Sequence, residues 1–369
     1  MLRLLVVLLG ARAAARPAAG ACSVFTNVRA DGRGGDPWAD LRSLVASLAR
    51  AKVRTCVITD APEASARDAL GAALNDVYPA PAMASVRATF ADLLGRAWAV
   101  PLTNKAARAV DRTLVARLAR ILAFADPPYA TTLFLDDDAY ACPGPALAAA
   151  LAAPPPGPTV RLAERWLAQG EIFDAAYAPA LARLRAAAAC AASADASDGA
   201  GALACADGGD AAADACAGFT RAPPDIQGGA VYVVRSRASA AWAAALRDAY
   251  VEYWAASNKT KFLGRDQPAH DAIAARFCRS SVLGALPTTF NVKLSLHRTL
   301  ANFAPVRHVL LGPALVLHYK GPKEATGPAL CAALHGDGVR TVLNATTHLL
   351  DRGADAASAL RVVDSVSIR

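Results

Sequence analysis

The stretch that decides the fold is TTLFLDDDAYAC, residues 131–142, in which five strand-favouring residues run directly into three carboxylates. Charges of like sign this close together repel one another unless water or a cation separates them. Asp136 and Asp138 stand at alternate positions, so both can reach one hard cation such as Mn²⁺ or Mg²⁺, which prefers a few carboxylate oxygens together with waters and phosphates. The alternative interpretation is a solvated acidic turn.

The residues around this stretch alternate between strand and helix patterns. The segments SVFTN (23–27) and VRTCVITD (53–60) are typical of strands, and Trp38 to Arg50 carries apolar residues at helical spacing. A longer helical stretch, 104–124, leads into a further strand at 131–135. The alternation predicts an α/β fold with a mostly parallel sheet flanked by helices, in a single elaborated domain. Ligands of such sheets bind beyond the carboxyl ends of the strands, where the three aspartates would lie.

The chain divides into a leader, one main domain and a C-terminal extension. Residues 1–21 contain a short apolar run ending in small residues, which predicts a signal peptide or short anchor. The domain is expected to span 22–330 and the extension 331–369. Within the domain, the Ala/Asp/Gly-rich segment 180–219 predicts a low-complexity insertion.

The cysteines and the charge limit the compartment and the partners. Eight cysteines without any CxxC pair favour an oxidising compartment over a zinc site, although Cys56 also fits a buried free thiol. Two glycosylation triplets, at Asn258 and Asn344, agree with a secretory route to the Golgi lumen or outside the cell. The net charge of +8 comes without a basic run interleaved with aromatics, so no nucleic-acid partner is expected. Membrane contact is expected to be at most a short N-terminal tether.

A strand that ends in D-x-D also occurs in phosphatases of the haloacid-dehalogenase type, where the first aspartate is a nucleophile. That pattern requires threonine or valine two residues after the second aspartate, where this chain has Tyr140. It also places the aspartate after the first strand, whereas Asp136 follows at least two earlier strand–helix units. The phosphatase interpretation is therefore disfavoured.

Six motifs, of which the D-x-D stretch is the third, stand in a particular order along the chain. They are SVFTN, NKAARAV, TLFLDDDAY, QGGAVYVVRS, RDQPAHDAI and LHYKGPK. In this order they resemble the GT-A-fold glycosyltransferases, the nucleotide-diphospho-sugar transferase superfamily, in the style of the glycogenin-like enzymes. The resemblance extends from residue 22 to about residue 325, outside the insertion.

This resemblance implies roles for individual residues. Asp136, Asp138 and His318 would bind Mn²⁺ or Mg²⁺, and Asp266 and Gln267 would lie near the reacting carbon of the sugar. The remaining candidates would contact a nucleotide-diphosphate sugar as donor: Asp136, Asp137, Asp138, Lys105, Arg108, Gln227, Gly228, Gly229, Gly321 and Lys323. Lys320 is an alternative to Lys323 for neutralising the diphosphate.

The motifs depart from the glycogenin-like pattern at two places. Gln227 stands where asparagine is usual, and Lys323 follows Gly321 by two residues where the pattern has three. Each residue also has a simpler interpretation, because His318 could be an ordinary strand histidine and Asp266 could merely cap a helix that has a proline in its first turn. The resemblance implies a metal-dependent glycosyltransferase with an unknown acceptor. A catalytically inactive binding or scaffold protein with the same fold is the alternative.

Overall fold

A computed structural model describes residues 17–26, 36–80, 116–153, 157–164, 226–257, 266–286, 288–293, 314–318 and 323–333. Its centre is a seven-stranded sheet in the order β3-β2-β1-β4-β7-β6-β8. The strands are β1 (Ala19–Phe25), β2 (Thr55–Thr59), β3 (Asp76–Pro79), β4 (Thr131–Leu135), β6 (Val160–Glu164), β7 (Ile226–Val234) and β8 (Leu283–Leu286). The low-complexity segment predicted at 180–219 lies outside the described residues.

The sheet is mixed but mostly parallel. Strands β3, β2, β1 and β4 run in one direction, and β6 pairs with β8 in parallel. Strand β7 runs antiparallel to both of its neighbours, β4 and β6. The beginning of β7 therefore lies at the same edge of the sheet as the end of β4, with Leu135 opposite Ala230. The predicted α/β architecture with a mostly parallel sheet and flanking helices is confirmed.

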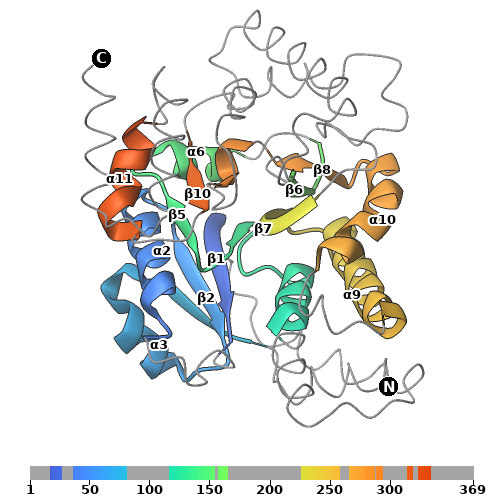
Figure 1. Cartoon of the computed structure of the whole chain (residues 1–369), viewed down its shortest axis with the longest axis horizontal. Helices are drawn as coiled ribbons and strands as arrows, with labels where there is room; N and C mark the ends of the chain where they lie inside the picture. Colours follow the sequence, from blue (N-terminus) through green and yellow to red (C-terminus); the bar gives the residue numbers. More distant parts are fainter. Residues whose placement is uncertain are drawn as a thin grey trace, which may run out of the picture.

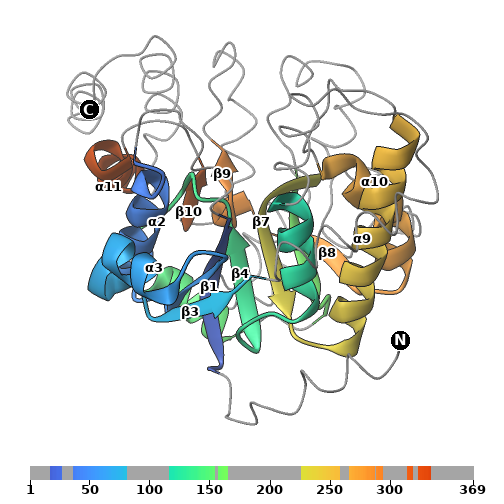
Figure 2. The ribbon, with the colours of Figure 1, turned by 90° about the horizontal axis from the view of Figure 1, so that it is seen from below.

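Helices cover both faces of this sheet (Figures 1 and 2). One face packs against α2 (Ala39–Arg50), α3 (Glu63–Leu70) and α6 (Ala146–Ala152), and the other against the helical residues 116–125, α9 (Arg237–Ser257) and α10 (Gln267–Arg279). Side chains of β4 alternate between the two cores, because successive residues of a strand point to opposite faces. Phe134 packs with Phe124 and Trp242 in the core on the side of α9 and α10. Leu133 and Leu135 pack in the core on the opposite face, with the apolar residues of α2.

Helix α2 matches the prediction for residues 38–50. Its apolar residues Leu41, Leu44, Val45 and Leu48 are all buried, as the helical spacing requires. The hydroxyl of Ser47 accepts a hydrogen bond of 2.9 Å from the backbone nitrogen of Ala141, which ties the helix to β5. Helix α3 ends at Leu70, where Gly71 takes a positive φ of 71° and a single 3-10 turn (η2, Gly71–Ala73) follows.

A second, three-stranded sheet carries the C-terminal part of the fold. Its order is β5 (Ala139–Ala141), β10 (Val316–His318) and β9 (Val292–Lys293), with the 3-10 turn η7 (Thr288–Phe290) just before β9. Helix α11 (Lys323–Ala333) packs against α2 and is joined to the end of β5 by the disulfide Cys142–Cys331. The side chain of Tyr140 lies directly against Gly327, where any Cβ would meet its ring at 2.6 Å. Two segments that are far apart in the sequence, around Tyr140 and around Gly327, thus meet next to α2.

The interpretation of Cys56 as a free thiol is wrong, because Cys56 forms a disulfide with Cys22. These two residues are register partners on the adjacent strands β1 and β2, so the sulfur atoms are brought together by the sheet itself. Cys278 on α10 is also disulfide-bonded.

Among the residues that the structure describes, no helix is long and apolar enough to cross a membrane.

The predicted domain boundaries fall inside regular elements. Strand β1 begins at Ala19, before the expected start at residue 22, and α11 continues past residue 330 to Ala333. Gly20 fits tightly in β1, because a Cβ there would lie 2.7 Å from the carbonyl oxygen of Arg54 and closer still to the ring of Tyr129. The boundaries 22 and 330 remain predictions.

Candidate metal centre

Asp136 and Asp138 lie in a tight turn between β4 and β5. The backbone nitrogen of Asp136 donates to the carbonyl oxygen of Gly229 at 3.0 Å, and the nitrogen of Ala139 donates to the carbonyl oxygen of Asp136 at 3.1 Å. The first bond extends the pairing of β4 with β7, and the second reverses the chain. Both carboxylates are partly exposed, at 23% for Asp136 and 25% for Asp138. The turn therefore presents two carboxylates at the carboxyl end of a buried strand.

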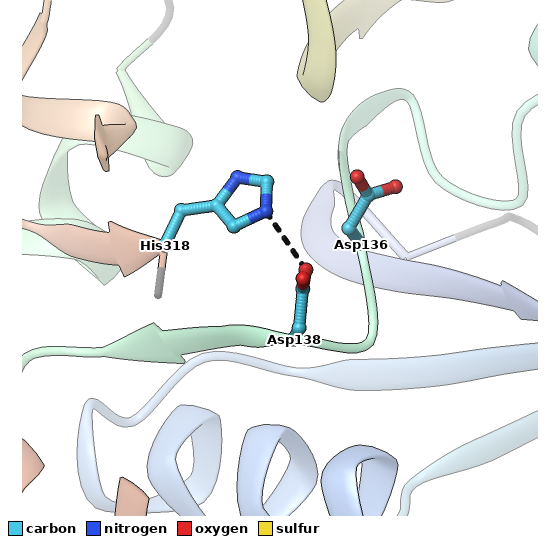
Figure 3. A group of neighbouring side chains, drawn as sticks. All are labelled: Asp136, Asp138 and His318. Carbon is cyan, nitrogen blue, oxygen red and sulfur yellow. Dashed lines mark ion pairs between the residues drawn. The ribbon is translucent and has the colours of Figure 1, made fainter. Parts of the chain in front are cut away.

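His318 reaches the same place from the opposite end of the chain. Strand β10 pairs antiparallel with β5 so that His318 stands opposite Ala139, the residue after Asp138. Its Nε2 atom lies 2.8 Å from Oδ1 of Asp138, and Figure 3 shows the imidazole and both carboxylates around one spot. One ligand atom from each of Asp136, Asp138 and His318 lies within 4.8 Å of the others. The structure therefore brings together the three residues predicted as metal ligands.

The other nitrogen of His318 contacts Asn291, which directly precedes β9. The distance from Nδ1 to the amide oxygen of Asn291 is 3.2 Å, and both side chains are buried. An amide oxygen can only accept, so in this arrangement Nδ1 carries the proton and Nε2 presents a lone pair. That lone pair faces a carboxylate oxygen of Asp138, which is also an acceptor.

Two lone pairs 2.8 Å apart repel each other unless a positive charge, either a second proton on the imidazole or a metal cation, lies between them or beside them. Two carboxylates and an unprotonated imidazole nitrogen form a donor set that suits a divalent cation, with the carboxylates favouring Mg²⁺ and Mn²⁺ and the imidazole favouring transition metals. The residues therefore fit the predicted metal, and the donor set by itself does not choose between Mn²⁺ and Mg²⁺.

Two arginines stand behind Asp136. Arg120 forms an ion pair with Oδ1 of Asp136, and a nitrogen of Arg117 lies 3.9 Å from the same oxygen. The side chain of Arg120 is only 6% exposed, and its second terminal nitrogen has no hydrogen-bond partner among the residues that the structure describes. A buried guanidinium N–H without a partner is energetically costly. An anion or a ligand hydroxyl next to Asp136 would satisfy it.

Asp266 joins this group from the start of α10. Its carboxylate is 6% exposed and lies 3.9 Å from Arg117 and 3.8 Å from the imidazole of His270. Burial alone would raise the pKa of Asp266, but His270 and the guanidinium groups of Arg117 and Arg120 outweigh it and hold that pKa well below the usual range. Asp266 is therefore ionised at neutral pH.

The carboxylate of Asp266 does not cap its helix, although the residue occupies the N-cap position. It turns instead toward β7, where a Cβ on Gly228 would lie 2.9 Å from its Oδ2 atom. Glycine at position 228 therefore leaves room for the carboxylate. The structure places Gly228 and Asp266 in direct contact, as expected for two residues of one site.

For the remaining predicted site residues, the structure shows only some of the side chains and few contacts with the metal centre. Gly229 bonds to Asp136 as described, while Gln227 lies in β7 and Gln267 begins α10 with side chains outside the described atoms. Lys323, at the start of α11, is buried, and its Nζ atom lies 2.6 Å from Oδ1 of Asp40 on α2. Lys105, Arg108, Lys320 and Gly321 lie outside the described residues, and Asp137 takes part in the electrostatic surroundings of Arg117.

Sequence reasoning missed four residues of this region, namely Arg117, Arg120, His270 and Asn291. The two arginines are three residues apart in a stretch predicted as helix, so they share a face that could have been compared with the D-x-D turn. His270 follows Asp266 by one helical turn, which is also a readable spacing. No pattern in the sequence pointed to Asn291, because its role depends on the pairing of β9 with β10.

Comparisons with known proteins were made by sequence and by structure. No protein-family model and no curated protein sequence matches the chain. Solved GT-A glycosyltransferases match it across most of its length. Mouse xyloside xylosyltransferase 1 is 13% identical with a TM-score of 0.42, covering 81% of this chain and 97% of its own. The galactosyltransferase LgtC is 12% identical with a TM-score of 0.43, covering 94% and 95%.

A third match is the glycosyltransferase GlyE from Streptococcus pneumoniae, at 11% identity and a TM-score of 0.39, covering 96% of this chain and 64% of its own. At these identities and scores the matches are too distant to assign an activity.

Proposed function

We propose that this protein is a metal-dependent glycosyltransferase, which moves a sugar from a nucleotide-diphosphate donor to an acceptor hydroxyl. The observation that carries the proposal is the convergence of Asp136, Asp138 and His318, whose ligand atoms lie within 4.8 Å of one another at the carboxyl end of β4. A sugar-nucleotide needs both a cation for its diphosphate and polar groups for its sugar. Side chains that could hold such a cation, and polar groups beside them, lie together at this edge of the sheet.

Asp136, Asp138 and His318 would hold the cation, Mn²⁺ or Mg²⁺. When bound, the ion neutralises the diphosphate and stabilises it as a leaving group. Arg120 and Arg117 fix the orientation of the Asp136 carboxylate by contacting its Oδ1 atom. The unpartnered nitrogen of Arg120 supplies a donor for a substrate oxygen beside it.

In the transfer, the bond between the anomeric carbon and the diphosphate oxygen breaks, and its electron pair leaves with the diphosphate. The acceptor oxygen forms the new bond to the anomeric carbon, and its proton passes to a base. Asp266 is a weak candidate for that base, because a general base works best with a pKa near the working pH and the pKa of Asp266 is held low. We propose that Asp266, with Gln267, instead orients the sugar and stabilises positive charge on it.

The disulfides Cys22–Cys56 and Cys142–Cys331 support a luminal or extracellular location, because disulfides persist in oxidising compartments. We therefore extend the proposal to a secretory-pathway enzyme of the Golgi lumen or the exterior. The acceptor belongs to one of three classes: a glycan, a protein or a small molecule.

The test is to incubate the purified full chain with a panel of sugar-nucleotides and Mn²⁺ and to measure nucleotide release. Activity is expected with at least one donor, and it should be lost with a chelator and in Asp138→Asn. The control is Asp126→Asn, which removes an exposed carboxylate paired with Arg235 away from the D-x-D turn. Absence of release with every donor and a broad set of acceptors would contradict an enzymatic role.

One observation favours the alternative, a non-catalytic binding or scaffold protein. Lys323 is buried against Asp40, so in this arrangement its charge is already paired and is not presented to a diphosphate. Calorimetry with the donor separates the two functions. Metal-dependent binding of a sugar-nucleotide without turnover would support the scaffold.

A further inference from the structure

We infer that Asn291 is a positioning residue for the metal ligand His318: its amide oxygen selects the imidazole tautomer that leaves Nε2 free for the cation. The inference rests on the metal-dependent function proposed above, and it assigns a role to a residue outside the predicted metal ligands.

The pairing of β9 with β10 places Asn291 beside His318. In this parallel pair, Val292 is opposite Leu317 and Lys293 is opposite His318. Asn291 directly precedes β9, two residues before the register partner of His318, so its side chain reaches the imidazole diagonally across the pair. The backbone nitrogen of Leu315 donates to the carbonyl oxygen of Thr289 at 2.7 Å, which fixes the two segments against each other just before the strands begin.

The contact is a single hydrogen bond in a dry environment. The distance from Nδ1 of His318 to Oδ1 of Asn291 is 3.2 Å, and the two residues are only 7% and 8% exposed. Water cannot easily replace a partner at this depth, so the group that faces Nδ1 decides where the imidazole proton resides. With an oxygen there, the proton is on Nδ1 and the lone pair of Nε2 points toward Asp138.

The opposite amide orientation would give an inert site. If the amide NH₂ faced Nδ1, Nδ1 would have to accept, and the proton would move to Nε2. Nε2–H would then donate to Asp138 at 2.8 Å, which is an ordinary hydrogen bond with no free nitrogen for a cation. Asn291 therefore separates a metal-binding arrangement from one that cannot bind metal through His318.

The first experiment measures binding of Mn²⁺ alone to the full chain, by the electron paramagnetic resonance signal of the free ion. In Asn291→Leu, which keeps the size of the side chain but removes the acceptor, the affinity should fall about 10–100-fold, the usual effect of losing the partner of a metal-bound histidine. Asn291→Asp keeps an oxygen acceptor and should bind close to wild type. Thr289→Val is the control for a change at a neighbouring buried position, and circular dichroism checks that each variant is folded.

The second experiment locates the proton by long-range ¹H–¹⁵N NMR of protein labelled at histidine, with His318→Gln to assign the signal. The wild type should carry the proton on Nδ1 with Mg²⁺ present, and Asn291→Leu should lose this preference. A proton on Nε2 in the wild type with Mg²⁺, or unchanged Mn²⁺ affinity in Asn291→Leu, would overturn the role of Asn291 alone. A wild type that takes up no Mn²⁺ would overturn the proposed metal-dependent function as well.

Discussion

The position of Asp266 in the sequence predicts one role for its carboxylate, and the contacts in the folded protein give it another. Its position before a helix with proline in the first turn predicts a cap, yet its side chain makes no capping hydrogen bond. Arg117 on another helix and Gly228 on β7 turn the carboxylate into the site instead. The distinction could not be predicted from sequence, because both partners are more than thirty residues away along the chain.

The ionisation of Asp266 leads to a pH-dependent prediction. Its pKa is lower in the folded protein than the unfolded value of about 3.9, so its charge stabilises the fold above that pH and this stability is lost as the pH falls through the folded pKa. Asp266→Asn removes the buried negative charge that Arg117 and His270 face, while Arg120 keeps its ion pair with Asp136, and it should destabilise the protein by about 3 kcal/mol at pH 7. Denaturant unfolding from pH 7 down to pH 3 should show this difference shrinking below about pH 4. A difference that stays constant with pH would contradict the assignment.

Gly228→Ala tests the close approach of β7 to Asp266. The added methyl group would lie 2.9 Å from a carboxylate oxygen, so we expect a loss of about 1–3 kcal/mol in the free energy of unfolding and a displaced carboxylate with reduced transfer activity. The same glycine substitution made in an Asp266→Ala background should cost much less, because the opposing atoms are gone. Equal costs in the two backgrounds would show that another contact is responsible.

The residues of the metal centre differ in how far the sequence reveals them. Asp136 and Asp138 could be predicted because the strand and the carboxylates are contiguous, and His318 because a family resemblance supplied it. Asn291 could not be predicted, and Arg120 offered only its helical spacing from Arg117 as a signal, since each acts on a ligand from a different element. Partners of this kind become visible only when strand register and helix packing are known.

At the scale of elements, periodicity predicted the long or fully buried segments. Helix α2 and the strands β2 and β4 follow their hydrophobic patterns closely. Strands β5 and β10 have only three residues each, which is too short for a pattern to be distinguished from a loop. Helix α11 was not predicted because Pro328 and Gly327 lie inside it, and both residues disfavour helix interiors.

The disulfide Cys142–Cys331 joins two of these unpredictable elements, β5 and α11. Replacing both cysteines by alanine should lower the free energy of unfolding by about 2–5 kcal/mol and also weaken Mn²⁺ binding, because β5 follows Asp138 and α11 closely follows His318. The matched control is alanine at both Cys22 and Cys56, which joins β1 and β2. Both pairs should affect unfolding, but only the first should change Mn²⁺ affinity.

At the scale of the whole molecule, the metal centre depends on segments that are far apart in the sequence. Asp138 and His318 meet only when β10 pairs with β5, so an unfolded chain cannot offer the same set of ligands. Mn²⁺ at one hundred times its dissociation constant should therefore stabilise the fold by about 2.7 kcal/mol. Thermal unfolding with increasing Mn²⁺ measures this gain, and Asp138→Asn should abolish most of it. A gain that survives in Asp138→Asn would place the ion elsewhere.

The antiparallel pairing of β6 with β7 has a consequence for how the chain can vary in length. Glu164 and Ile226 are register partners, so the polypeptide leaves the main sheet and returns to it at neighbouring positions. A short hairpin turn could connect these two positions. Because the entropy cost of closing a loop rises only slowly with its length, the connection between them can also be long. Cys278 is disulfide-bonded outside the pairs Cys22–Cys56 and Cys142–Cys331, so the engineered chain described next replaces it as well. An engineered chain with residues 165–225 replaced by a short turn, and with Cys278→Ala, is thus a minimal scaffold in which the D-x-D turn keeps its support.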